Sequence, residues 1–100
     1  MVNEILNSEK IIKKIKERSK DIKKYNVNKI GLFGSFAKNK QNKKSDIDII
    51  VNFDKETFDN YMDLLFLLEK MFKRKIDLVI EKGIHPELDY VKYEAKYVRL

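Results

Sequence analysis

Residues 31–53 read GLFGSFAKNKQNKKSDIDIIVNF, and the rest of the chain is arranged around them. The apolar start is typical of a strand, and Gly34-Ser35 is typical of a tight turn that opens a short helix. Residues 38–45 have the composition of a positively charged loop, and 47–53 form a β-branched run suited to a buried central strand. The stretch therefore predicts a strand, a turn, a basic loop and a second strand.

Two aspartates, Asp46 and Asp48, flank Ile47 at the start of that second strand. Side chains alternate between the two faces of a strand, so we expect both carboxylates on the same face. Adjacent carboxylates repel each other, and aspartate is depleted in strands. A cation between them removes the repulsion, and hard divalent ions such as Mg²⁺ prefer carboxylate oxygens and share their coordination with phosphates. We interpret the pair as a metal site.

A phosphate-binding turn is predicted next to this pair. Gly34 and Ser35 lie where a strand meets a helix, a junction that presents backbone N–H groups to an anion. Glycine lets a phosphate approach closely, and the serine hydroxyl can donate to a phosphate oxygen. Gly-Ser alone is common in turns, but an Asp-x-Asp on the next strand makes the combination specific.

Asp77 is the third candidate carboxylate. It comes early in a strand predicted at 76–80, which we expect beside the strand that carries Asp48. In isolation Asp77 would be interpreted as a strand-edge residue facing water. The convergence of three carboxylates on neighbouring strands favours a functional role instead.

The overall composition bounds the class of protein. One hundred residues are enough for a single domain, expected over 1–100. Lys and Arg number 22 against 16 Asp and Glu, a formal charge of +6 that favours an anionic partner or serves solubility alone. Cysteine is absent, which excludes a disulfide scaffold. No run of about eighteen apolar residues and no signal peptide are found, so we expect a cytoplasmic protein without a membrane partner.

Three longer helices and a third strand complete the prediction, with the helices at 8–25, 57–74 and 87–98 and the strand at 76–80. Ser8 and Thr57 are the expected N-caps. The helix at 57–74 is long enough for a crossover, so the strands on either side of it should be parallel, whereas the shorter link between the first two strands allows an antiparallel return. We therefore predict an α/β (α+β) fold with a small mixed three-stranded sheet flanked by helices.

Apolar residues at helical spacing predict the core. The first helix carries them at Ile11, Ile12, Ile15 and Ile22. The second helix carries a broad apolar stripe from Phe58 to Phe72, and the basic run at 73–75 ends it as the macrodipole favours. Lysines and acids are interleaved on the other face of the first helix, which indicates a solvated surface; direct nucleic-acid binding is not expected.

The motifs resemble the nucleotidyltransferase superfamily typified by DNA polymerase β, specifically its minimal nucleotidyltransferase (MNT) domains. Residues 34–38 (GSFAK), 45–51 (SDIDIIV) and 76–79 (IDLV) are similar to the family's G-S-x-A-[RK]-G, S-D-[IL]-D-[IL]-x-[IV] and third-carboxylate strand. Asn39 stands where the family usually has glycine. The resemblance spans nearly the whole chain and implies the polymerase β-like nucleotidyltransferase fold.

The resemblance also implies roles for six residues. Asp46 and Asp48 are expected to hold two divalent ions, Mg²⁺ or Mn²⁺, and Asp77 to complete the inner site and help deprotonate the acceptor hydroxyl. Gly34 and Ser35 are expected to hold the β- and γ-phosphates of ATP, and Lys38 to offset the remaining charge. The implied reaction is nucleotidyl transfer with pyrophosphate as the leaving group.

MNT domains are commonly encoded beside HEPN-domain proteins, in pairs that resemble toxin–antitoxin modules. The resemblance implies an antitoxin that transfers AMP from ATP to a tyrosine of a HEPN ribonuclease. Three alternatives stay open: an antitoxin that only binds and blocks its partner, which Asn39 favours; transfer to a small molecule such as an aminoglycoside or to an RNA end; and a small domain whose acidic strand merely faces water.

Two further features have no assigned function. His85 precedes Pro86 in a predicted turn, and we expect it to be structural or incidental. Tyr90, Tyr93 and Tyr97 fit either a contact surface or a core-facing helix.

Overall fold

The computed structural model describes residues 6–38, 40, 45–83, 86–88 and 94–100. Its centre is a mixed sheet of four strands in the order β3-β2-β1-β4. The strands are β1 (Val27–Phe33), β2 (Ile47–Phe53), β3 (Ile76–Ile80) and β4 (Lys96–Arg99). The helices are α1 (Ser8–Glu17), α2 (Ser19–Lys23), α3 (Gly34–Ala37) and α4 (Phe58–Phe72), with short 3₁₀ turns η1 (Glu81–Gly83) and η2 (Pro86–Leu88).

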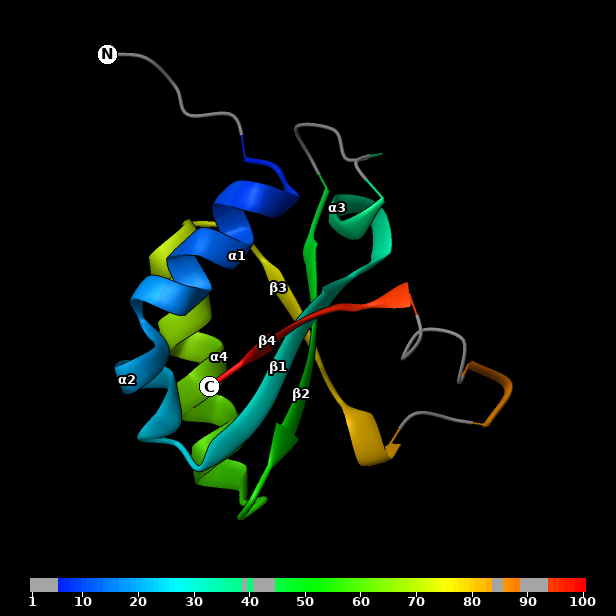
Figure 1. Ribbon diagram of the computed structural model, residues 1–100. Coiled ribbons are helices and arrows are strands. Elements are labelled where there is room, and N and C mark those ends of the chain that lie inside the picture. The colour runs from blue at the N-terminus through cyan, green and yellow to red at the C-terminus, as the bar shows by residue number, and fades with distance from the viewer. Residues whose placement is uncertain (1–5, 39, 41–44, 84–85, 89–93) are drawn as a thin grey trace.

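Helices cover one face of this sheet. Figure 1 shows α1, α2 and α4 together on that side, with α3 at the end of β1 and η1 beyond the end of β3. The inward residues of β2 are Ile47, Ile49, Val51 and Phe53, all buried. They alternate with side chains on the opposite face, where Asp48 and Asn52 are half-buried and Ile50 is buried. Asp48 lies among those outward side chains.

The strand pairing confirms the predicted topology of the first three strands. β1 pairs with β2 antiparallel, and β2 pairs with β3 parallel. The parallel pair is joined through α4, the crossover element predicted at 57–74. The predicted turn and short helix after the first strand are present as α3.

The fourth strand corrects the prediction of a three-stranded sheet. β4 (Lys96–Arg99) includes residues 96–98, which were expected to end a helix at 87–98, and it pairs antiparallel with β1, with Tyr97 opposite Gly31. A Cβ atom on Gly31 would come within 2.8 Å of Cδ1 of Tyr97, so the missing side chain leaves room for the ring. The Lys29 ammonium lies 4.1 Å from the Tyr97 ring centroid. Contacts with β1 thus override the helical pattern of this segment.

Part of that prediction lies outside the described residues. The middle of the expected helix, including Tyr90 and Tyr93, is not described, and neither is His85. Tyr97 is described, and it packs on the sheet rather than on a helix.

The first predicted helix is two helices. α1 ends at Glu17 and α2 begins at Ser19, with Arg18 between them at φ −103° and ψ 19°. Asn7, not Ser8, is the N-cap of α1: its side-chain oxygen accepts a hydrogen bond from the Lys10 amide at 2.9 Å. The Thr57 cap is confirmed, since its hydroxyl accepts from the Asn60 amide at 3.0 Å.

The core agrees with the predicted apolar faces except at one end of α4. Ile11, Ile15 and Ile22 are fully buried, and α4 buries Leu64, Leu68 and Phe72. Phe58, predicted as the first member of the core stripe, is 76% exposed. It lies about 120° around the helix from Leu64, so it falls outside the buried stripe of α4.

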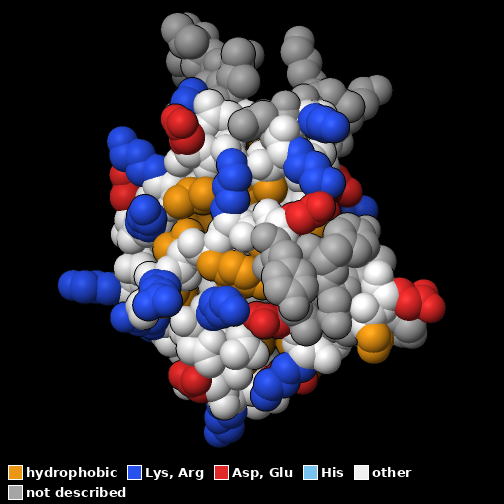
Figure 2. All heavy atoms as spheres, turned by 45° about the vertical axis from the view of Figure 1, so that its right-hand side comes forward, with side chains coloured by type: hydrophobic (Ala, Val, Ile, Leu, Met, Phe, Trp, Pro, Cys, Tyr) orange, Lys and Arg blue, Asp and Glu red, His pale blue; other side chains and the backbone are white. Residues whose placement is uncertain are grey.

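One face of the molecule carries charges of both signs. In Figure 2 lysine and arginine side chains are separated by acidic side chains and by patches of exposed hydrophobic atoms. The solvated face expected for the first helix is found on α1, where Glu9, Lys13, Lys16 and Glu17 are exposed. Among the described helices, none combines the length and apolarity needed to cross a membrane.

Gly31→Val tests the packing of β4. A side chain at this position collides with the ring of Tyr97 and with Ile50, whose Cγ2 lies 3.1 Å from the Cβ position. We expect a loss of about 1–3 kcal/mol in the free energy of unfolding, measured by urea denaturation. Gly83→Val is the matched control, because nothing lies within 4 Å of its Cβ position. Equal stability of the two variants would contradict the close packing of Tyr97 on Gly31.

Candidate active site

Asp48 lies at the centre of the candidate site because of its position in β2. Its register partner on β1 is Phe33, and its partner on the parallel strand β3 is Asp77. Ile47 and Ile49 on either side of it are buried in the core, so the Asp48 side chain projects from the opposite face. The structure therefore brings Asp48 and Asp77 together, as the sequence predicted.

Gly34 brings the predicted phosphate-binding turn against Asp48. Its φ of +71° lies in the left-handed region, which glycine adopts at little cost. A Cβ atom on Gly34 would overlap a carboxylate oxygen of Asp48 and lie 2.9 Å from its Cγ. Glycine is therefore required here for two reasons, the backbone angle and the space taken by the carboxylate. Ser35 follows at the start of α3 and is half-buried.

The electrostatics of Asp48 are those of a crowded carboxyl group. Partial burial raises its pKa from 3.8 to about 6, and the negative charges of Asp77 and Asp46 add to the effect. A hydrogen bond between the side chains of Asp48 and Asp77 favours the protonated form further. The ionised pair is thus unfavourable without a positive charge beside it.

Asp46 contributes to this field from outside the strand. β2 begins at Ile47, so Asp46 is an exposed residue that precedes the strand rather than part of its alternating pattern. Within the described ranges, no three His, Asp or Glu side chains are gathered in the manner of a metal site. The donors themselves fit a hard divalent cation, because they are carboxylate oxygens whose mutual repulsion a cation would remove. Asp48 and Asp77 are the close pair of that set.

Lys38 ends α3 and has a partner that the sequence did not reveal. Its backbone N–H donates to the Gly34 carbonyl at 3.2 Å, and its ammonium lies 3.2 Å from a carboxylate oxygen of Glu94. Both side chains are about half exposed, so the ion pair is weak and phosphate can compete for the lysine. Asn39 and residues 41–44 of the basic loop lie outside the described residues.

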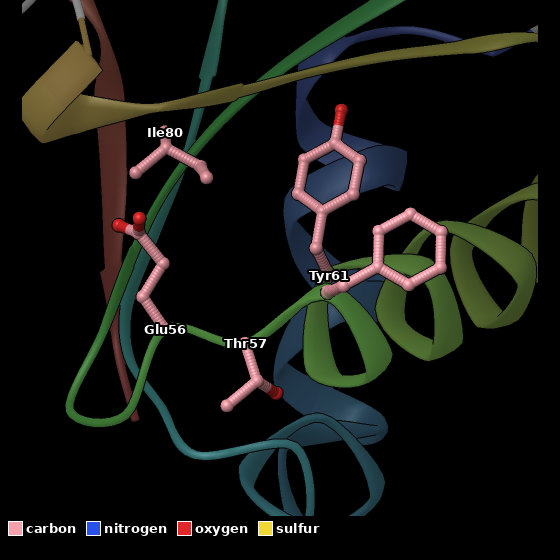
Figure 3. A pocket seen from close by; sticks show the side chains of 5 residues that line it. Glu56, Thr57, Tyr61 and Ile80 are labelled. Carbon is pink, nitrogen blue, oxygen red and sulfur yellow. The ribbon is translucent and has the colours of Figure 1, made fainter.

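A hollow of about 290 Å³ lies beside β3, apart from the carboxylates. Figure 3 shows Tyr61 extending from α4 towards β3, with Ile80 on that strand and Glu56 and Thr57 on the connection before the helix. The Tyr61 hydroxyl donates to the Leu78 carbonyl at 2.6 Å. Burial and, after it, the charge of Asp77 raise the pKa of Tyr61.

Arg74 is a further residue near the site that the sequence did not single out. It belongs to the basic run at 73–75, which the sequence associated with the end of α4. Its guanidinium donates to the Ser45 carbonyl at 3.0 Å and lies 5.4 Å from the ring centroid of Phe36. The contact partners are distant in sequence, so helical periodicity gave no signal for them.

The site thus combines a glycine turn and paired carboxylates on a mixed sheet with a helical crossover. Residues 8–99 match the model of the nucleotidyltransferase domain family, and the chain belongs to this family. A relative from Methanocaldococcus jannaschii named "Putative protein adenylyltransferase MJ1379" is 45% identical over 78 residues, which are 75% of this chain and 76% of that protein.

Solved structures agree with this fold. A structure described as a minimal nucleotidyltransferase superposes with a TM-score of 0.80 at 24% identity, covering 94% of this chain and 98% of the other. A toxin–antitoxin crystal structure with AMP-PNP gives a TM-score of 0.65 at 28% identity, covering 92% of this chain and 72% of the matched one. The chain is therefore a nucleotidyltransferase with the fold expected from its motifs.

Gly34→Ala tests the contact between the turn and Asp48. We expect the substitution to destabilise the protein by about 1 kcal/mol from the backbone angle alone, with a further loss from the overlap with the carboxylate. In an Asp48→Ala background the overlap disappears, so the same substitution should cost less. The measurement is a double-mutant cycle by urea denaturation. Equal costs in both backgrounds would show that the turn does not press on Asp48.

Asp48→Asn tests the raised pKa. The folded state holds the Asp48 proton more tightly than the unfolded state, so the free energy of unfolding should fall as pH rises from about 4 through 6. In EDTA at pH 7.5 the asparagine variant should therefore be more stable than the wild type, and the difference should shrink towards pH 4. Thermal denaturation across this range measures it. Asp63→Asn, an exposed change of the same charge, is the control for the loss of one negative charge.

Proposed function

We propose that this protein transfers AMP from ATP to a hydroxyl group, that of a tyrosine, on a partner HEPN-domain toxin, and thereby acts as its antitoxin. The observation that carries the proposal is the alignment of Asp48 with Asp77 directly against Gly34. This arrangement places carboxylates next to a turn suited to phosphate. The relative named as a protein adenylyltransferase and the toxin–antitoxin structure with AMP-PNP support the choice of ATP and of a protein acceptor.

The residues have separate roles in this proposal. The amides and hydroxyl at Gly34 and Ser35 hold the β- and γ-phosphates, and Lys38 leaves Glu94 to offset their charge. The acceptor oxygen attacks the α-phosphorus, the bond from that phosphorus to the bridging oxygen breaks, and pyrophosphate leaves. Asp77 takes the proton of the acceptor hydroxyl.

Asp46, Asp48 and Asp77 are the residues that would hold the divalent cations, Mg²⁺ or Mn²⁺. When bound there, two such cations supply Lewis-acid stabilisation of the charge that develops on the phosphates. The carboxylates would hold the cations next to the Gly34-Ser35 turn, where the phosphates are proposed to bind. The proposal rests on their oxygen donors and on the strain of the ionised pair, which a cation relieves.

A non-catalytic antitoxin is the second candidate. Within the described residues the three aspartates are not gathered into a finished metal site, and the ammonium of Lys38 is paired with Glu94. An antitoxin that binds and blocks its partner needs neither feature. The experiment below separates the two functions.

Label transfer from α-³²P-ATP with Mg²⁺ tests the enzymatic proposal. The acceptor is the protein encoded next to this one, and we expect label on that protein. An Asp46→Ala/Asp48→Ala double variant and an EDTA-treated sample should both lose it, because the proposed reaction needs the carboxylates and their cations. An Asp59→Ala/Asp63→Ala variant, which removes two exposed charges on α4, should keep it.

Binding measured in parallel decides between the candidates. If the wild type forms a stable complex with the neighbouring protein but transfers no label to it, the enzymatic proposal is contradicted for that acceptor. This result would favour the antitoxin that only binds and blocks its partner. Mass spectrometry of the labelled protein identifies the acceptor residue. Label on serine or threonine would contradict tyrosine as the acceptor and leave only AMP transfer to a hydroxyl group.

A further inference from the structure

Arg74 contacts two segments of the candidate site from a third. It lies between the end of α4 and the start of β3, three positions before Asp77. One guanidinium nitrogen donates to the carbonyl of Ser45, the residue before Asp46. The guanidinium carbon lies 5.4 Å from the centroid of Phe36, which follows Gly34-Ser35 in α3 and is only 1% exposed. The Arg74 side chain thus links α3 to the segment that leads into Asp46. Its own segment leads into Asp77.

These contacts call for arginine rather than any cation. A planar guanidinium can stack on an aromatic ring and donate N–H groups in its own plane at the same time. A lysine ammonium is a point charge that cannot combine the two contacts in this geometry. The neighbouring Lys73 and Lys75 are exposed, so among the three cations of this run Arg74 is the one partly buried.

Asp46 is the part of the site that most needs such support. Asp48 is fixed by strands on both sides, whereas Asp46 precedes β2 and takes no part in its pairing with either neighbour. The backbone around it is held by the Arg74 bond to Ser45 and by the Ile47 amide, which donates to the Lys75 carbonyl at 3.1 Å. Both bonds come from the short segment between α4 and β3.

We propose that Arg74 is a positioning residue, which fixes Asp46 relative to Asp48 and to the Gly34-Ser35 turn by clasping Ser45 and Phe36 together. This inference rests on the proposed metal role of the aspartates. Arg74 touches neither substrate nor cation in this role; it acts through the Ser45 carbonyl. Supporting residues of this kind typically change metal affinity or activity by about 10- to 100-fold when removed.

Mn²⁺ binding to the full chain, followed by electron paramagnetic resonance, tests the inference without any acceptor protein. We expect Arg74→Ala to raise the Mn²⁺ dissociation constant by about 10-fold or more. Arg74→Lys should show most of the same loss, because charge alone does not replace the clasp. Lys75→Ala removes a neighbouring exposed charge and is the matched control, with affinity close to that of the wild type.

A double-mutant cycle with Asp46→Asn separates positioning from general destabilisation. If Arg74 acts through Asp46, its substitution should have little further effect on Mn²⁺ affinity once that carboxylate is gone. Full additivity of the two changes, or an unchanged affinity in Arg74→Ala, would overturn the inference. Should Arg74→Ala fail to fold, Arg74→Lys carries the same test, and a wild-type affinity in that variant would count against the clasp.

The outcomes also distinguish this inference from the proposed function. If the wild type binds no Mn²⁺, the metal role of the aspartates fails and the inference fails with it. If the wild type and Arg74→Ala bind Mn²⁺ equally, only the role of Arg74 is lost. With the proposed acceptor present, the expected signature is a fall in kcat at saturating Mg²⁺-ATP for Arg74→Ala and not for Lys75→Ala.

Discussion

The carboxylate of Asp48 is confined between the backbone of Gly34 and the carboxyl group of Asp77, and the candidate site depends on this confinement. Three strands enforce it, because β1 places its end beside Asp48 and β3 places Asp77 in register with it. The register holds the two backbones side by side, and ionised carboxylates at these positions repel each other. A cationic ligand would relieve this repulsion.

The apolar face of the same strands makes this strain tolerable. Ile47 and Ile49 are fully buried on either side of Asp48, under the helices that cover one face of the sheet. α4 contributes Leu64 and Leu68 to that core and also makes the crossover that forces β3 to lie parallel to β2. Core residues and a site residue thus alternate along β2. Because Ile47 and Ile49 are buried on one face of the strand, Asp48 between them projects from the other face.

The connections around the sheet decide how open the site is to a nucleotide. Lys38 lies against Glu94 in an exposed ion pair, which an incoming triphosphate can exchange at little cost. Arg74 joins the residue before Asp46 to α3 through its contacts with Ser45 and Phe36.

The sequence by itself determined the first three strands, the parallel direction of the pair joined by the long helix, and the placement of the Gly34-Ser35 turn next to the carboxylate pair. These follow from local signals: a β-branched run, a helix long enough for a crossover, and alternation along a strand. It did not determine the fourth strand, because four residues are too few for a periodic pattern. The state of Lys96–Arg99 was set by contacts with Gly31 on β1.

The tertiary structure alone decided where the exposed ends of these elements point. The direction of Phe58 away from the core, the pairing of Lys38 with Glu94, and the clasp of Arg74 on Ser45 all join residues distant in the chain or depend on how α4 is seated. Helices and strands can be predicted from local periodicity because the pattern lies in residues that are neighbours in the sequence. Side-chain partners across the fold depend on the packing of all elements at once, so no single stretch of sequence contains them.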